Sequence, residues 1–144
     1  MTPGPARRAA ALMVTIIVST LAAGCDSLLD TSRDLADEAQ LLVTGTSPVP
    51  LRVILSNNFT NIQNPDDGTI TTQLILADTL ELTLPIDHRY PMGNNARIFI
   101  RVWQPDSAQT ADVLMRVLLD GEREVYEQRA TLRDAYLEYT FTYF

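Results

Sequence analysis

The sequence is poor in the residues from which most catalytic and metal sites are built. Its 144 residues include one cysteine, one histidine and no lysine. A single cysteine excludes an intramolecular disulfide, and one cysteine with one histidine cannot supply the three or four nitrogen and sulfur ligands of a zinc site. The six glycines each lie near a turn, so none is left for a phosphate-binding glycine-rich loop. These absences disfavour disulfide scaffolds, zinc proteins and nucleotide-binding enzymes.

Basic charge is also scarce after the first few residues. All 18 acidic residues follow residue 25, where nine arginines accompany them, so that part of the chain carries a net charge of about −9. An acidic surface disfavours nucleic acid, whose phosphates need a basic face. It also disfavours electrostatic adhesion to anionic lipid head groups. We therefore predict no nucleic-acid partner, and any membrane attachment must have another source.

The longest apolar run lies at the amino terminus. Arg7 and Arg8 precede 15 uncharged residues, 9–23, which end in small side chains. A basic head, an apolar stretch and small residues at its end are typical of a secretory signal peptide. The run is shorter than the ~20 apolar residues of a membrane-spanning helix, and it is apolar on every side, unlike a core helix. We predict a signal peptide over residues 1–24.

The end of this segment, Leu21-Ala22-Ala23-Gly24-Cys25, resembles the lipobox of bacterial lipoproteins. In that family a diacylglyceryl group is attached to the cysteine thiol, and a dedicated peptidase cuts before that cysteine. The resemblance implies cleavage between Gly24 and Cys25 and a lipid on Cys25. The strongest form of the motif has leucine three residues before the cysteine, where this sequence has Ala22.

The lipobox implies a location as well as a modification. The protein would be held by its lipid on the extracytoplasmic side of a membrane of the bacterial cell envelope, with inner and outer membrane both open. The resemblance covers residues 7–25 only. No cofactor other than the covalent lipid is predicted.

The remaining chain divides into a short tether and one domain. Residues 25–39 comprise the lipidated cysteine and an acidic tether with few large apolar residues. One or two helical turns are expected from Ser32 as N-cap, with Leu35 and Ala39 on one face. Residues 40–144 have a length suited to a single domain.

From Gln40 onward, short β-rich segments alternate with turn residues. Strands are predicted at 40–44, 51–59, 69–77, 80–86, 97–103, 111–119, 122–132 and 136–144, with long connections at 61–68 and 87–95. Pro85 cannot donate to a strand ladder, so its strand ends there or lies at an edge. Asp120-Gly121 predicts a hairpin whose register stays open. The last strand is expected in the core, with an exposed edge as a further role.

These strands predict an all-β fold, an antiparallel immunoglobulin-like β-sandwich of about 7–8 strands. The Cys–Trp–Cys pattern of immunoglobulin domains is absent because only one cysteine is present.

No catalytic residue is predicted. A nucleophilic triad would have to join His88 to one of the serines beyond the signal peptide, which are Ser27, Ser32, Ser47, Ser56 and Ser107. No Gly-x-Ser-x-Gly elbow is present, and we expect His88 to be a loop residue.

Asp66 and Asp67, in the stretch 64–68, are the best candidates for a hard cation. Calcium takes six to eight oxygen ligands, and this loop offers three or four. We therefore interpret it as a turn and predict no metal site.

The sequence favours a non-enzymatic, lipid-anchored protein whose sandwich is a binding or structural module. The alternative is an accessory subunit of an envelope assembly, docking through an exposed strand edge or through the connections at 60–68 and 87–95. A small hydrolase that uses His88 is the least favoured hypothesis.

Overall fold

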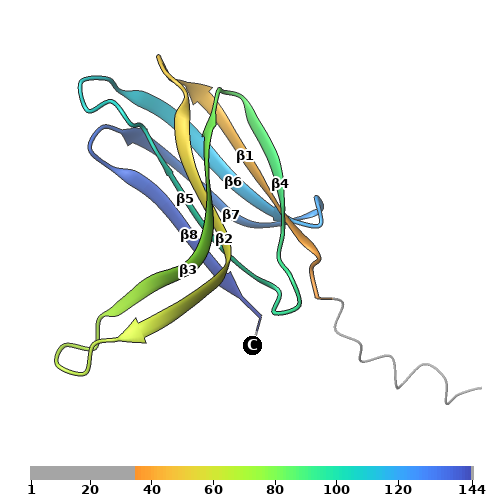
Figure 1. The fold of residues 1–144 in the computed structure, drawn as a ribbon. Coiled ribbons are helices and arrows are strands. Elements are labelled where there is room, and N and C mark those ends of the chain that lie inside the picture. The colour runs from red at the N-terminus through yellow and green to blue at the C-terminus, as the bar shows by residue number, and fades with distance from the viewer. Residues whose placement is uncertain (1–34, 144) are drawn as a thin grey trace, which may run out of the picture. The chain divides into compact units, whose positions relative to one another are not determined.

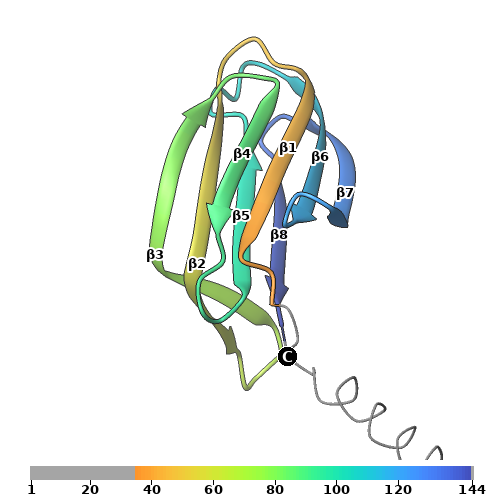
Figure 2. The same ribbon diagram turned by 90° about the vertical axis from the view of Figure 1, so that its right-hand side faces the viewer.

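The computed structural model describes residues 35–143, which form eight strands. Their bounds are β1 Glu38–Thr46, β2 Leu51–Gln63, β3 Ile70–Leu82, β4 Ile86–Pro91, β5 Arg97–Trp103, β6 Ala111–Leu119, β7 Arg123–Leu132 and β8 Tyr136–Thr142. The strands build two antiparallel sheets, β4-β1-β6-β7 and β3-β2-β5-β8, which pack face to face (Figures 1 and 2). The predicted antiparallel β-sandwich is confirmed.

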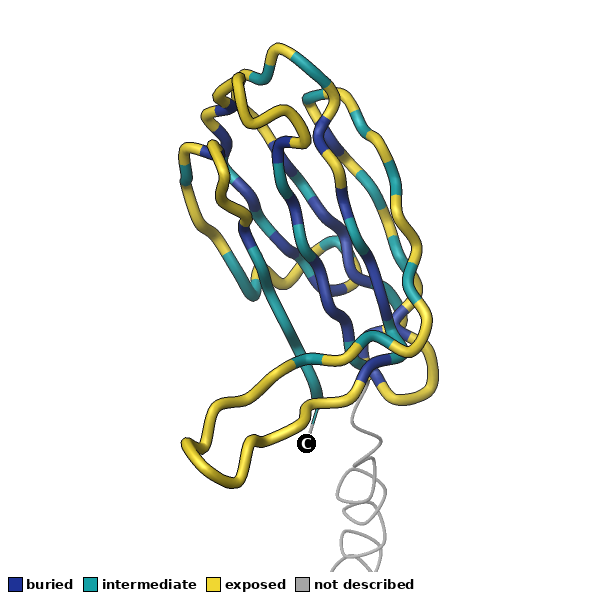
Figure 3. The backbone as a smooth tube through the Cα atoms, turned by 60° about the vertical axis from the view of Figure 1, so that its left-hand side comes forward, coloured by how far each residue is buried: buried dark blue, intermediate teal, exposed yellow. Residues whose placement is uncertain are grey.

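The two middle strands of each sheet supply most of the core. Alternate residues of these strands point inward and are at most 2% exposed: Leu41, Val43, Leu51, Val53, Leu55, Ile98, Ile100, Val102, Val113, Met115 and Val117. Full burial of a side chain of this kind is worth about 1.5–3 kcal/mol. Figure 3 shows the buried backbone running through the middle strands, with exposed segments at the edges and turns.

The strand order differs from that of an immunoglobulin constant domain, in which the first two strands pair in one sheet. Here β1 lies between β4 and β6, whereas β2 lies between β3 and β5 in the other sheet. The likeness to immunoglobulin domains is thus one of architecture.

The domain begins earlier than the sequence suggested. Ala36 and Ala39 are buried in the core, and β1 starts at Glu38. The prediction of helical turns that place Leu35 and Ala39 on one face is therefore wrong for this part of the chain. Small alanines between acidic residues gave no recognisable strand pattern. Gly24, Cys25 and the rest of the tether to Asp34 lie outside the described residues.

Three predictions in the middle of the chain are also wrong. The connection predicted at 61–68 begins only after Gln63, because β2 continues to that residue. The segments predicted as separate strands at 69–77 and 80–86 form the single strand β3, and Pro85 lies in the turn that follows it. The connection predicted at 87–95 contains β4. The alternation in β4 was hidden because its outward residues, Asp87 and Arg89, are charged and exposed at the edge of a sheet.

The predicted hairpin at Asp120-Gly121 is confirmed, and its register is settled. A three-residue turn and an irregularity at Val125 place Arg116 opposite Glu127. Arg116 forms ion pairs with Glu124 at 2.5 Å and Glu127 at 3.5 Å. No helix within residues 35–143 has the length and apolarity needed to cross a membrane.

Candidate binding surfaces

His88 and Asp87 do not act together on one face of the fold. They are neighbours in β4 and therefore point to opposite sides of the strand. Asp87 accepts a hydrogen bond from the Gln40 side chain at 2.6 Å, while His88 is half-buried opposite Leu41. The expectation that His88 is a loop residue is wrong, because it belongs to a strand.

Two of the serines considered as partners of His88 are hydrogen-bonded to other groups. Ser47 donates to the carbonyl of Val49 at 2.6 Å, and the buried Ser56 donates to the carbonyl of Leu76 at 2.5 Å. Ser107 lines a cavity whose lining does not include His88. Ser27 and Ser32 lie outside the described residues. The structure therefore brings His88 together with none of the three described serines.

Asp66 and Asp67 lie at the tip of the β2–β3 hairpin, and both take part in the turn. The Asp66 amide donates to Asn64 Oδ1 at 3.0 Å. Asp67 Oδ1 accepts from the hydroxyl and the amide of Thr69, at 2.7 and 2.9 Å. These two hydrogen bonds, that of the hydroxyl first, lower the pKa of the Asp67 carboxyl. Between Leu35 and Tyr143, no group of three or more histidine, cysteine, aspartate or glutamate side chains is placed to hold a metal ion.

The β2–β3 hairpin extends past the rest of its sheet as a hairpin arm, residues 60–76 (Figures 1 and 3). Irregularities in the pairing at Leu55–Phe59 precede it, and such bulges bend a strand. The arm carries four large apolar side chains that are 49–69% exposed: Ile62, Ile70, Ile75 and Leu76. Exposed apolar side chains gathered on one projecting element are typical of an interaction surface.

The root of the hairpin arm is well anchored. The hydroxyl of Ser56 bonds the carbonyl of Leu76 and accepts from the amide of Asn58 at 3.1 Å. Phe59 is buried against Phe99, with ring centroids 6.2 Å apart. The arm thus leaves the sandwich in a defined direction.

The outer edge of β3 carries neither charge nor proline over residues 70–77, and its two charged residues, Asp78 and Glu81, lie in the part that pairs with the beginning of β2. Natural edge strands carry charges, prolines or strong twists that deter addition of another strand. In the described sheets the other outer strands have such residues: Asp87, Arg89 and Pro91 in β4, Arg123, Glu124, Glu127 and Arg129 in β7, and Glu138 in β8. The uncharged stretch of β3, residues 70–77, belongs largely to the hairpin arm. The predicted edge position of the last strand, β8, is also confirmed.

A second candidate surface is a cavity of about 380 Å³ on the outer side of the same sheet. We call it the Trp103 cavity. Trp103 and Tyr136 lie opposite each other in the β5–β8 register and both line it, together with Gln104, Ser107 and Asp134. Because Trp103 pairs with Arg52 near the start of β2, the cavity lies at the end of the sheet remote from the hairpin arm.

The one cation that the described part of the chain contributes to this cavity, Arg101, is already engaged. Its guanidinium lies 4.6 Å from the centre of the Tyr136 ring. It donates to Glu138 Oε2 from Nε at 2.8 Å and from Nη2 at 2.6 Å. The lining therefore has no unpaired positive charge to attract an anion.

Gln104 is the residue of this cavity that the sequence did not reveal. The residue is 6% exposed, and its Oε1 accepts a hydrogen bond from the Asp106 amide at 2.6 Å. Its Nε2 has no hydrogen-bond partner in the described part of the chain. A buried amide donor without an acceptor is uncommon, since it costs about 1–3 kcal/mol. The only sequence signal was its place after the strand containing the single tryptophan.

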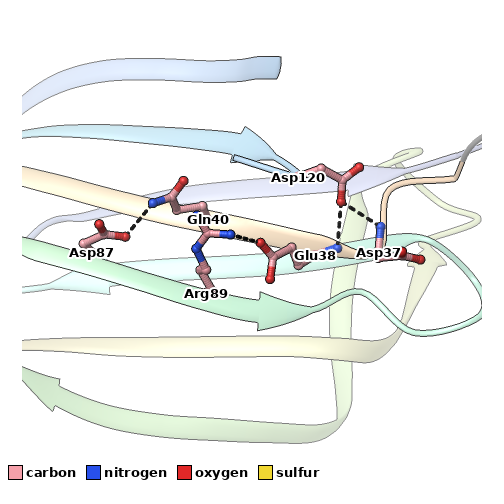
Figure 4. A network of polar contacts seen from close by, with 6 residues as sticks. All are labelled: Asp37, Glu38, Gln40, Asp87, Arg89 and Asp120. Carbon is pink, nitrogen blue, oxygen red and sulfur yellow. Dashed lines mark hydrogen bonds and ion pairs between the residues drawn. The ribbon is translucent and has the colours of Figure 1, made fainter. Parts of the chain in front are cut away.

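A polar network fixes the start of the domain (Figure 4). Asp120 Oδ1 accepts from the amides of Asp37 and Glu38 at 2.9 and 3.2 Å. Arg89 pairs with Glu38 across the β1–β4 ladder. The β6–β7 turn thereby holds the beginning of β1, where the predicted tether joins the domain.

Fold and surfaces together define an antiparallel β-sandwich domain with two candidate binding surfaces. No family model, no curated protein and no solved structure matches this chain.

Proposed function

We propose that this protein is a lipid-anchored, non-catalytic binding module of the bacterial cell envelope, which docks a partner protein on its hairpin arm. The observation that carries the proposal is the uncharged stretch of the β3 edge, residues 70–77.

Strand addition is the mode of docking that this edge suits. An added strand would bond to the unpaired backbone groups of β3, and pockets for alternate side chains would select it. Ile70, Ile75 and Leu76 supply apolar contact area beside that edge. Because residues 69–77 carry no charge, the partner segment would be an extended, uncharged and largely apolar strand.

The anchor accounts for membrane attachment of an acidic chain. One acyl chain binds a membrane marginally, and several bind firmly, so the multiply acylated Cys25 would hold the protein without help from its surface charge. Twelve residues lie between Cys25 and Glu38, so these two residues are at most ~45 Å apart when the chain is extended. The domain would therefore act close to the membrane.

The proposal also states that the protein is not an enzyme. The hydrolase hypothesis needed His88 beside a serine and a carboxylate. The separation of His88 from Asp87, and the other bonds of Ser47 and Ser56, favour a binding module.

Site-specific photocrosslinking in cells tests the docking proposal. A photoreactive residue at Ile75 in β3 should give one discrete adduct, and the same residue at Gln128 in β7 should give none. The substitution Gln73→Lys places a charge on the β3 edge and should abolish the Ile75 adduct, whereas the matched Gln128→Lys should not. An adduct present in equal amount with Gln73→Lys, or no adduct at Ile75, would overturn the proposal.

The mass of the adduct separates two forms of this function. A second protein in stoichiometric amount identifies the chain as an accessory subunit of an envelope assembly. An adduct of twice the chain's own mass identifies self-association through β3 and rejects a distinct partner.

A further inference from the structure

We infer that the Trp103 cavity binds a neutral saccharide that carries an acetamido group. This site is separate from the hairpin arm and goes beyond the docking proposal.

Gln104 defines the hydrogen bond that the ligand must accept. The amide of Asp106 donates to Oε1 at 2.6 Å, which fixes the orientation of the side-chain amide. Nε2 then remains as a buried donor without a partner in residues 35–143. A carbonyl or carboxylate oxygen on the ligand would satisfy it. A donor held in a largely buried position strengthens discrimination, since a ligand without the acceptor leaves it unpaired.

The charge of the lining favours a neutral ligand over an anion. Arg101 donates two hydrogen bonds to Glu138 and stacks on Tyr136. Asp134, which also lines the cavity, adds a negative charge. An incoming carboxylate would lose its water without gaining a free cation. The acceptor for Gln104 is therefore an uncharged carbonyl.

The walls suit a flat, partly apolar ring. Trp103 and Tyr136 are cross-strand neighbours, and Tyr136 is 58% exposed. Aromatic side chains of this kind combine an apolar face with a polar group at one end, and the C–H face of a sugar ring packs against such a surface. A volume of about 380 Å³ lies within the range of sites for small molecules.

The other polar residues distinguish a saccharide from a proline-rich peptide, which also binds aromatic grooves. Asp134 and Ser107 line the cavity, and the aspartate carboxylate can only accept hydrogen bonds. A proline-rich strand offers carbonyl acceptors and few donors. A sugar offers hydroxyl donors around its ring, and an acetamido group adds the carbonyl for Gln104. The acetamido sugar meets both requirements at once.

The single tryptophan of the chain makes the site directly observable. Trp103 is the only tryptophan, so a change in its fluorescence reports on this cavity alone. The purified protein is titrated with an N-acetylglucosamine trisaccharide and, separately, with the glucose trisaccharide that lacks the acetamido groups. We expect saturable binding with about a tenfold preference for the N-acetylated ligand. No saturable change with either saccharide would overturn the inference.

Two variants assign the preference to named residues. Gln104→Glu keeps an acceptor for the Asp106 amide but removes the Nε2 donor, so the tenfold preference should disappear. The control Gln109→Glu adds the same charge at an exposed position of the loop that follows β5, and it should keep the preference. Tyr136→Ala, at an exposed position that tolerates truncation, should weaken both ligands at least tenfold. An unchanged preference in Gln104→Glu contradicts the role of the amide.

A proline-rich decapeptide is titrated against the protein in the same way, as a test of the alternative ligand. Binding of this peptide in place of the saccharides would reject the saccharide assignment. Adduct formation at Ile75 in the crosslinking experiment is independent of this result, so failure of one proposal is distinguishable from failure of the other.

Discussion

Among the glycines of residues 35–143, Gly45 has the least room for a side chain. It lies in β1 with φ +131°, and a Cβ added there would come within 2.0 Å of the carbonyl oxygen of Asp112. Only glycine allows so close an approach of β6.

We expect Gly45→Ala to lower the free energy of unfolding by at least ~2 kcal/mol, because the backbone must shift. Urea unfolding measures the effect. Gly68→Ala at the tip of the hairpin arm is the control, since its φ is +73° but its nearest neighbouring atom is 3.8 Å away. That variant should cost only about 1 kcal/mol. Equal costs for the two variants would contradict the role of the β1–β6 approach.

In the described part of the chain, Tyr90 is the side chain whose pKa the fold shifts most. Burial, and then its hydrogen bond and charge interaction with Asp78, raise the pKa of the Tyr90 hydroxyl to about 12. Its pKa is higher in the folded than in the unfolded chain, so it contributes stability that is complete below pH 10 and is lost as the pH rises through 12.

The difference in ultraviolet absorbance between wild type and Tyr90→Phe isolates this group from the other four tyrosines. We predict a difference titration with its midpoint near pH 12. The variant should also lose stability less steeply than wild type between pH 10 and 12. A midpoint near 10 would show that Tyr90 is neither buried nor bonded to Asp78.

At the scale of elements, the hairpin arm depends on its root. The hydroxyl of Ser56 satisfies the amide of Asn58 and the carbonyl of Leu76 where the pairing of β2 and β3 is irregular. Ser56→Ala leaves both groups without that partner.

We predict that Ser56→Ala lowers the unfolding free energy by about 1–2 kcal/mol and speeds hydrogen exchange in residues 60–76 more than in β6. Ser47→Ala is the matched control, because Ser47 bonds locally to Val49 in a turn. Uniform acceleration over both sheets would show that the hydroxyl stabilises the fold in general and not the arm.

The elements also show how far the sequence could predict the fold. In β2, β5 and β6 the alternation of buried and outward-facing residues could be recognised in the sequence, because the outward residues are polar or turn residues flank the strand. Those strands were therefore predicted within a few residues of their bounds. β4 was missed because its six residues include four that are polar or charged. A short edge strand buries little, so its sequence need not alternate clearly.

The candidate sites were harder to predict from the sequence than the strands. The turn at Asp66-Asp67 was recognised because proline and glycine define turn chemistry locally. The Trp103 cavity was not, because it joins β5, the loop after it and the turn before β8. Such proximity depends on strand order, and strand order is set by long-range pairing that a single sequence does not display.

At the scale of the whole molecule, the protein as proposed consists of a lipid anchor, a short tether and a binding domain. An acidic chain with one cysteine has no attraction of its own for anionic membranes. The account therefore depends on the fate of Cys25, since a protein left without its lipid would not be held near a membrane-bound partner.

The intact mass of the protein purified from the membranes of its own cells tests this claim most directly. The account predicts a chain of 120 residues beginning at Cys25 that carries the added mass of a diacylglyceryl group and further acyl chains. The variant Cys25→Ser should keep its leader and lack the acyl mass. A native protein with an uncut leader, or one cut at another bond and free of acyl mass, would contradict the account.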